Sequence, residues 1–366
     1  MSMLESLIEI EGRRTISRIN ENMIDRTDVS NDIKFIRDTT WTKDELLKEH
    51  RRYFQGIAKD SPVGFFIIDD SVLEKAGKPR KMEGLGWHYS HSKSRVIYGH
   101  SIVSSQYRVG SISFPYDFEF YRTEKDAQKE KAEFKTKIDI ARGFIEDFTP
   151  FFNEKIYALM DSWYTSHEVI TTVKFRGFDV IGGLKSNRIF KLYENGPKHT
   201  LSAYVRNLRN ASFEEVHLGD AAFLVKRVEC WLPKVGKVII LISKRKRDRS
   251  KCFILSTDTT LSNEEILRYY SYRWDIETGY LYCKDRLGLG HYQMRNMKAI
   301  EKFCALVISA FCYLEAMRVL SNESSIGQSR WYFKVSRRRQ FVDRVANLVR
   351  RGVSMQKIYR ELKLVA

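Results

Sequence analysis

Three acidic residues stand where a carboxylate could do chemistry. Asp70 ends a continuous apolar run, Asp161 ends a second one, and Glu277 lies in a stretch that predicts a helix. Such apolar runs are typical of strands buried on both faces, and carboxylates at the ends of buried strands converge at one edge of a sheet. Carboxylates that lie close together repel one another unless a cation compensates them, and Mg²⁺ binds through one or two carboxylates together with substrate phosphates. The three acids therefore indicate a divalent-metal site that acts on phosphate groups.

The stretch around Glu277 has an unusual distribution of charge. On a helical wheel of about 100° per residue, Tyr270, Arg273, Glu277 and Lys284 fall within roughly 60° of one another. Large apolar residues flank this stripe on both sides, whereas an ordinary surface helix places its charges opposite its apolar face. The pattern indicates a carboxylate that faces a cleft, with cations beside it. A surface ion pair between Arg273 and Glu277 explains the same spacing equally well and would contribute only about 0.2–0.5 kcal/mol.

The composition favours a nucleic-acid partner. The chain has 366 residues and a formal charge of +17, from 63 Lys and Arg against 46 Asp and Glu, which indicates a polyanionic partner, nucleic acid before membrane. No apolar run approaches the ~20 residues of a membrane span. The five cysteines include no C-x-x-C pair, so a disulfide framework and a structural zinc site are not expected. Two divalent ions roughly 3.5–4 Å apart can promote phosphoryl transfer, so a nuclease or a DNA strand-transfer enzyme fits both site and charge.

The elements that must position these acids follow from periodicity. Residues 1 to about 60 predict helices, with Thr42 and Glu45 as a capping box. Basic residues on these helices, such as Arg14, could contact phosphates or form a solvated face. After Pro62 we expect a central strand that ends at Asp70. Two further strands are expected over 95–105 and 107–114, the second ended by Pro115, and helical character follows over 124–148.

Residues 171–258 alternate with a period near two and predict an all-β block, in which the segments 172–175 and 199–205 are among the expected strands. This block carries the densest basic run of the chain, Lys244, Arg245, Lys246 and Arg247, which on so basic a chain we interpret as a phosphate contact. Helices return after Ser262 or Asn263, either of which can cap. A linker after Ser321 and a basic tail lead into a last helix near 341–362.

The residues quoted above resemble a known family. The spacing Tyr270-x2-Arg273-x3-Glu277-x6-Lys284 matches at all four positions the Y-R-E-K signature of bacterial insertion-sequence transposases of the fourth insertion-sequence family. Residues 65–71 resemble the family's first-aspartate strand, in which the acid just before Ser or Thr is the ligand; this selects Asp70 over Asp69. Residues 159–164 resemble its second-aspartate motif. The resemblance covers about residues 60–300.

This resemblance implies a DDE transposase. Asp70, Asp161 and Glu277 would hold two Mg²⁺ ions, which Mn²⁺ could replace, for nicking of the transposon end and attack of the 3′-hydroxyl on target DNA. Tyr270, Arg273 and Lys284 would grip phosphates near the cleaved end. Relatives pass through a DNA hairpin and stabilise a flipped base with a Trp of the insertion. Trp231, the one Trp of the β block, is the candidate here, with a core position as its alternative.

The resulting expectation is an α/β fold: an RNase H-like mixed sheet flanked by helices, interrupted by a β-rich insertion, with helical N- and C-terminal parts. We expect a DNA-binding region over 1–60, catalytic parts over 61–170 and 259–325, the insertion over 171–258 and a basic helical tail over 326–366. The expected partners are double-stranded DNA, as terminal inverted repeats and target, and a second copy of the chain on that DNA. The expected place is the bacterial cytoplasm, at the nucleoid, without a membrane. A structure-specific nuclease of the same fold and a non-catalytic DNA-binding derivative are the alternatives.

Overall fold

The computed structural model describes residues 2–23, 27–77, 81–90, 93–209, 212–246 and 251–361. The chain divides into two compact units. The first unit comprises residues 1–56, 79–83 and 281–366, and the second comprises residues 57–78 and 84–280. Asp70, Asp161 and Glu277 all belong to the second unit, so that unit holds every carboxylate of the predicted site.

Helices form the first unit. They are α1 (Met3–Glu9), α2 (Ile16–Glu21), α3 (Val29–Asp38), α4 (Lys43–Ile57), α11 (Met297–Leu320), α12 (Ile326–Arg350) and α13 (Met355–Glu361). The predicted capping box at α4 is confirmed, because the Thr42 backbone N–H donates to Glu45 and the Glu45 N–H donates to the Thr42 hydroxyl. The Arg14 side chain is buried rather than part of a solvated face: its guanidinium donates to the carbonyl oxygens of Leu7, Ile10 and Gly12 and so satisfies the end of α1.

Within the described ranges, α11 is the one helix long and apolar enough to cross a membrane by length and composition. Two thirds of its most apolar window (67%) is buried inside the protein. Its ends and middle also carry Lys302, Glu315 and Arg318, and the last two form an ion pair at 2.7 Å. Burial of this kind is that of a core helix, which needs apolar residues on most of its surface.

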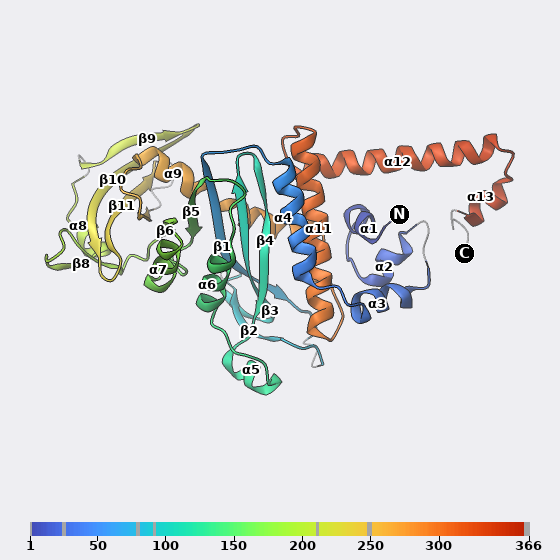
Figure 1. Cartoon of the computed structure of the whole chain (residues 1–366), viewed down its shortest axis with the longest axis horizontal. Helices are drawn as coiled ribbons and strands as arrows, with labels where there is room; N and C mark the ends of the chain where they lie inside the picture. Colours follow the sequence, from blue (N-terminus) through green and yellow to red (C-terminus); the bar gives the residue numbers. More distant parts are fainter. Residues whose placement is uncertain are drawn as a thin grey trace. The chain divides into compact units, whose positions relative to one another are not determined.

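A twelve-stranded mixed sheet forms the second unit. Its strands are β1 (Val63–Glu74), β2 (Gly86–Ser90), β3 (Arg95–Val109), β4 (Ile112–Tyr121), β5 (Lys155–Met160), β6 (Asp179–Gly183), β7 (Ile189–Lys191), β8 (Lys198–Thr200), β9 (Glu214–Leu218), β10 (Ala221–Leu232), β11 (Gly236–Arg245) and β12 (Lys251–Ser256). The order is β2-β3-β1-β5-β6-β12-β11-β10-β7-β8, with β4 paired to β3 and β9 paired to β10 (Figure 1).

The centre of this sheet combines antiparallel and parallel strand pairs. β1, β3 and β4 form an antiparallel meander, while β5 and β6 run parallel to β1. This mixed α/β arrangement is compatible with an RNase H-like fold. The strands of the predicted insertion are hydrogen-bonded into the same sheet through β6 and β12, and the boundaries of an insertion domain stay a prediction.

The helices of the second unit are α5 (Glu124–Glu130), α6 (Lys137–Asp147), α7 (His167–Phe175), α8 (Leu201–Arg206), α9 (Asn263–Ser271) and the first part of α10 (Trp274–Arg286). Among them, α6 packs against β3 and β4, and α9 packs against β6 and β12. Phe65 and Ile67 pack on one face against residues of α9 and α10, and Phe66 stacks on Phe148, directly after α6, on the other. Because side chains alternate along a strand, this pattern fixes which face each later residue of β1 occupies.

The structure corrects several predicted elements. β3 runs unbroken from Arg95 to Val109, and Pro115 lies inside β4 rather than ending a strand. β4 is tolerant of proline because it pairs with β3 only, and a bulge opposite Ser105 and Gln106 accommodates it. Residues 172–175 belong to α7, and residues 201–206 form α8, since short apolar runs fit either period.

One further correction concerns the C-terminal part of the chain. The predicted basic tail and last helix are joined in α12, which begins after the N-cap Ser325 and runs to Arg350. No residue between Gln328 and Arg350 is Gly or Pro, so nothing in this stretch interrupts a helix. A turn with Gly352 at a φ of +72° then ends it.

Candidate active site

The ends of two parallel strands bring the first two acids together. β1 and β5 pair in register up to Ile68 opposite Met160, and the next residues along the two strands are Asp69 and Asp161. Residues at equivalent positions of neighbouring parallel strands lie side by side on one face of the sheet. Burial, together with the negative charge of the neighbouring Asp161, raises the pKa of the Asp69 carboxyl to about 7. Asp69 and Asp161 therefore form a pair of acids at this edge.

Asp70, the predicted ligand, lies on the opposite face of β1 from Asp69. Its carboxylate accepts hydrogen bonds from the Lys137 ammonium at the start of α6, at 2.5 Å, and from the Tyr164 hydroxyl at 2.8 Å. Burial and the charge of Asp70 raise the pKa of Tyr164 well above its ordinary value, so this hydroxyl keeps its proton and donates. Both partners of Asp70 are thus fixed, and the contacts favour Asp69 over Asp70 as the acid that shares a site with Asp161.

Arg273 joins the acid pair to Glu277. Its Nη1 lies 3.5 Å from the Asp69 Oδ2 and 2.6 Å from the Glu277 Oε1. The Arg273 side chain is only 12% exposed, whereas Glu277 keeps 34% of its side chain exposed. The guanidinium thus occupies the position of a cation between two carboxylates. The Arg273–Glu277 ion pair is therefore largely buried and is not a solvated surface pair.

The helix predicted over 270–284 is interrupted. α9 ends at Ser271, α10 begins at Trp274, and Tyr272 and Arg273 form a tight turn between them. The cause is tertiary, because the Tyr272 ring packs against Phe65 and lies 4.1 Å from the Arg108 guanidinium carbon. Arg273 still forms an ion pair with Glu277. The two residues are therefore close together as predicted, although no single continuous helix carries both.

Tyr270 reaches the acidic edge from the end of α9. Burial raises its pKa to about 12, so the hydroxyl stays protonated. A Cβ atom on Gly183 would come within 2.7 Å of this hydroxyl and within 3.0 Å of the Ser162 backbone nitrogen. Only glycine leaves room for Tyr270 beside the loop that carries Asp161.

These residues meet part of what a divalent-metal site requires. Carboxylate oxygens are the donors that Mg²⁺ prefers, Asp69 and Asp161 are in register, and a guanidinium already bridges Asp69 and Glu277. In the part of the chain that the structure describes, however, no three His, Cys, Asp or Glu side chains gather closely enough to hold an ion. The Glu277 carboxylate is paired with Arg273.

The basic run of the β block lies at the same end of the sheet as Asp161. Successive registers from β5 through β6 and β12 to β11 place Lys244 and Arg245 at that end. Lys246 forms an ion pair with Glu215 at 2.7 Å, and Arg247 lies outside the described residues. The position of the described part favours a contact with the same DNA that reaches the acids.

Trp231 lies at the other end of the sheet. It pairs with Lys237 of β11 and with Lys191 of β7, whereas the end of β10 nearest the acids is near Phe223, opposite Arg245. Its side chain is half-buried. This position gives no support to a role for Trp231 on a flipped base near the acids.

Lys284 follows Glu277 by seven residues on α10, about two helical turns, which keeps both on one side of that helix. It belongs to the first unit. Sequence reasoning missed Lys137 altogether, since a lysine at the first position of a charged helix gives no signal of its own. Tyr164 was part of the quoted second-aspartate motif, but nothing in the sequence linked it to Asp70.

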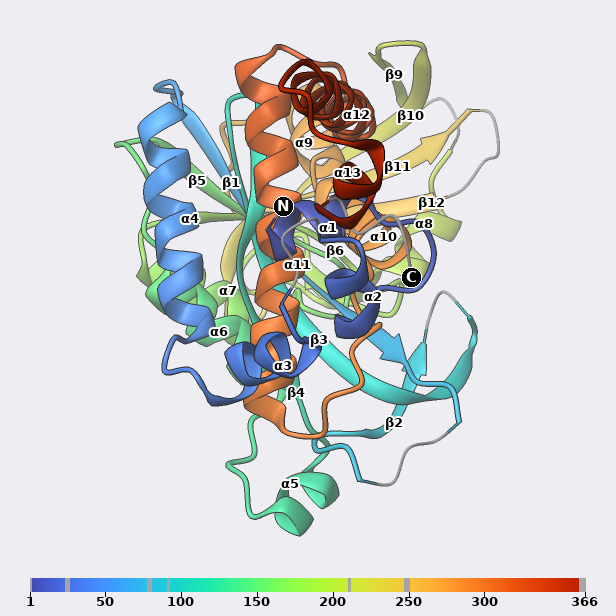
Figure 2. The same cartoon turned by 90° about the vertical axis from the view of Figure 1, so that its right-hand side faces the viewer.

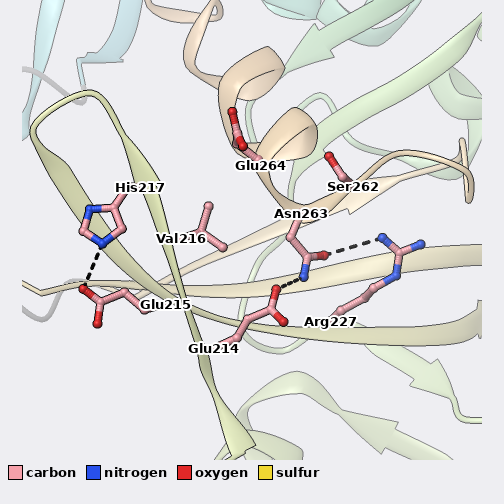
Figure 3. Close-up of a pocket in the computed structure, with 8 residues that line it drawn as sticks. All are labelled: Glu214, Glu215, Val216, His217, Arg227, Ser262, Asn263 and Glu264. Carbon is pink, nitrogen blue, oxygen red and sulfur yellow. Dashed lines mark hydrogen bonds and ion pairs between the residues drawn. The ribbon is translucent and has the colours of Figure 1, made fainter.

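A separate hollow of about 540 Å³ lies between β9, β10 and the start of α9. Figure 3 shows Glu214, Glu215 and Glu264 around it, with His217 bound to Glu215 and Arg227 bound to Asn263. Its acidic lining would repel a phosphate backbone. We therefore assign no part of the candidate site to it.

In a comparison with protein families, the model described as a transposase DDE domain aligns with residues 62–314. This range includes β1, β5, α9 and α10 and thus every acid of the candidate site. A search of curated proteins found no match.

Proposed function

Because the chain belongs to the transposase DDE domain family, we propose that it cuts the ends of an insertion sequence and joins their 3′-hydroxyl groups to target DNA. Membership of the family gives the transposase function itself. The cut-and-paste route, with terminal inverted repeats as the recognised DNA, is our extension of it. The charge of +17 supports a DNA substrate.

The observation that carries the proposal is the register of β1 with β5. It sets Asp69 beside Asp161 on the face covered by α9 and α10, and Arg273 links this pair to Glu277. Three acids from three separate elements are thus directed to one edge of the sheet. We propose Asp69, Asp161 and Glu277 as the metal-holding acids. Asp70 is the alternative that the sequence favours.

We propose that these acids hold two Mg²⁺ ions, or Mn²⁺ in their place, because carboxylate oxygens are the donors that such ions prefer. The chemistry that such ions supply is activation of water or of a 3′-hydroxyl and stabilisation of charge on the leaving oxygen. Asp70 then has a different task, since its bonds to Lys137 and Tyr164 hold β1, α6 and the loop after Asp161 together. It orients the strand that presents Asp69.

We propose that Tyr270, Arg273 and Lys284 bind phosphates of the cleaved strand. Arg273 compensates Asp69 and Glu277 in the protein alone. With divalent cations at the acids, its guanidinium would be available to bind a phosphate, for which its planar set of donors is well suited. The protonated Tyr270 hydroxyl donates beside it. Lys244 and Arg245 bind further phosphates along the same DNA. A second copy of the chain binds the other end of the insertion sequence.

The test is cleavage of a duplex that carries the ends of the encoding element, in Mg²⁺, by Asp69→Asn, Asp70→Asn, Asp161→Asn and Glu277→Gln variants. We expect the first, third and fourth to lose cleavage while binding the duplex normally. Asp70→Asn should cost no more than the roughly 10–100-fold of a residue that orients a ligand.

The two neighbouring aspartates serve as matched controls for each other. Cleavage by Asp69→Asn with none by Asp70→Asn would return the ligand role to Asp70. Cleavage by Glu277→Gln at the wild-type rate would show that the whole site is wrongly assigned.

A further inference from the structure

The hairpin of β2 with the start of β3 exposes a row of large apolar side chains. Trp87 and Tyr89 are each 53% exposed, and Val96 is 54% exposed. Trp87 pairs directly with Tyr98, and Tyr89 pairs with Val96, so all four side chains lie on one face of the hairpin. The Trp87 and Tyr98 rings also contact each other at 5.2 Å between centroids. We call these four residues the aromatic face.

The opposite side of the hairpin is packed. His88 is 7% exposed and meets the Tyr121 ring edge-on at 5.9 Å. A Cβ on Gly86 would come within 2.6 Å of the Asp126 carboxylate at α5. Burial lowers the pKa of His88 to about 4, so it packs as a neutral ring. Figure 2 shows the hairpin at lower right, running out beside α5. The hairpin is therefore held by its inner side, and the aromatic face is its outer side.

The aromatic face lies on the same side of the sheet as Asp69. Asp69 pairs with Ser104 on β3, and Tyr98 is six residues before Ser104 on the same strand. An even number of residues keeps side chains on one face. At about 3.3 Å per residue, six residues span roughly 20 Å. This equals about six base pairs of duplex DNA at ~3.4 Å each.

Cations lie at the end of the hairpin. Lys93 in the turn and Arg95 at the start of β3 have 49% and 63% of their side chains exposed, and both are paired to Glu74. Arg95 alternates with Val96 and so lies on the face of the ribbon opposite the aromatic face. One acid against two cations leaves this end of the hairpin positive, on a chain that carries +17 overall. A ribbon with flat aromatic rings on one face and cations at its end matches a nucleic acid, whose bases offer stacking faces and whose backbone is anionic. A two-stranded ribbon also has the width to enter a groove.

We propose that the aromatic face binds the duplex that is being cut, about six base pairs from the cleaved phosphate, with Trp87 and Tyr89 wedged against a base step. Wedges of this kind partly unstack the step and bend the duplex. His100 and Ile102, which lie between Ser104 and Tyr98 on this face, are buried, so the bent duplex would pass over the elements that cover this part of β3 to reach the hairpin. The proposal rests on the proposed function, because it takes the distance from the phosphate held at Asp69 and Asp161.

The test compares wild-type protein with a Trp87→Ala/Tyr89→Ala variant on duplexes that extend to increasing lengths past the cleaved position. Wild-type affinity should rise about tenfold when the duplex passes about six base pairs, in the range expected for base stacking on aromatic rings. The Ala variant should show no such rise and should cut the shortest duplex normally. A fluorescent base analogue at the sixth step should brighten on binding of wild type only.

Two controls complete the experiment. Trp87→Phe/Tyr89→Phe keeps the rings and should keep the rise, and Phe175→Ala removes a residue that is 89% exposed on α7 and should change nothing. An unchanged rise in the Ala variant would overturn the proposal. If the rise in affinity persists in the Trp87→Ala/Tyr89→Ala variant and its sedimentation coefficient differs from that of the wild type, the aromatic face binds a second copy of the protein instead. Failure of wild type to bind or cut any duplex would count against the proposed function itself.

Discussion

Asp69 and Asp70 are neighbours in the chain but lie in different environments. Asp69 faces Asp161 and Arg273, while Asp70 is tied to Lys137 and Tyr164. The difference is one step along β1, which moves a side chain to the other face of the sheet. At this scale the identity of the site depends on which face of β1 is covered by α9 and α10.

The raised pKa of Asp69 predicts a pH-dependent stability of the metal-free protein. Its pKa is about 7 in the folded chain against an ordinary 3.8, so the folded state binds this proton more tightly. Stability is therefore lost as pH rises from about 4 through 7. Asp69→Asn keeps the oxygen that accepts the Asp70 N–H and should stabilise the protein at pH 8 by about 2–4 kcal/mol, with little effect at pH 4.

Urea unfolding of wild type and Asp69→Asn at pH 4 and pH 8, with chelator present, checks this. Mg²⁺ added at pH 8 should stabilise the wild type and so reduce the difference in free energy of unfolding between the two proteins. An equal gap at both pH values would show that Asp69 is not the buried, repelled acid described above.

At the scale of elements, the site depends on how closely α9 approaches the loop after β5. A Cβ atom at Gly183, at the end of β6, would meet both the Tyr270 hydroxyl and the Ser162 backbone nitrogen. The interruption between α9 and α10 serves the same end, since the packing of Tyr272 against Phe65 lets Arg273 turn toward Asp69.

Gly183→Ala should therefore displace Tyr270 and lower the free energy of unfolding by about 1–3 kcal/mol, as overpacking does. The matched control is Gly143→Ala in α6, where an added Cβ meets nothing within 4 Å and should stabilise the helix by about 0.4–1 kcal/mol. Denaturant unfolding of the wild type and both variants measures these free energies of unfolding. If Gly183→Ala is as stable as wild type, the backbone there moves more easily than the contacts imply.

At the scale of the whole molecule, basic residues lie at both ends of one strand of the sheet, β11. β11 carries Lys244 and Arg245 at the end near Asp161 and Lys237 at the other end, where it pairs with Glu229 at 3.3 Å. The two ends of one strand thus provide an internal comparison. Only the end near the acids is expected to meet DNA.

Lys244→Ala/Arg245→Ala should weaken DNA binding and reduce the slope of log affinity against log salt by about two, one for each lost phosphate contact. Lys237→Ala on the same strand should leave the slope unchanged. Binding titrations over a range of salt concentrations measure both. Equal slopes for all three proteins would remove the basic run from the DNA interface.

Local patterns in the sequence determined much of the fold. Helix starts were predictable where a side chain can satisfy the free N–H groups, as in the capping box of Thr42 with Glu45 and at Ser262, one of the two predicted caps. The apolar runs before Asp70 and Asp161 marked the central parallel strands, β1 and β5. Short segments such as 172–175 were misassigned, because four residues fit a helix and a strand alike.

The Tyr270, Arg273 and Glu277 spacing likewise marked the right stretch, although the turn at Tyr272 could not be foreseen. The sequence by itself determined that acids end two buried strands and that a third lies on a helix with cations beside it. Only the tertiary structure decided that Asp69 faces Asp161, that Lys137 and Tyr164 hold Asp70, and that Trp231 lies far along the sheet. Spacing along a chain fixes alternation and period, whereas the partner of each face depends on strand register and on the helices that cover it.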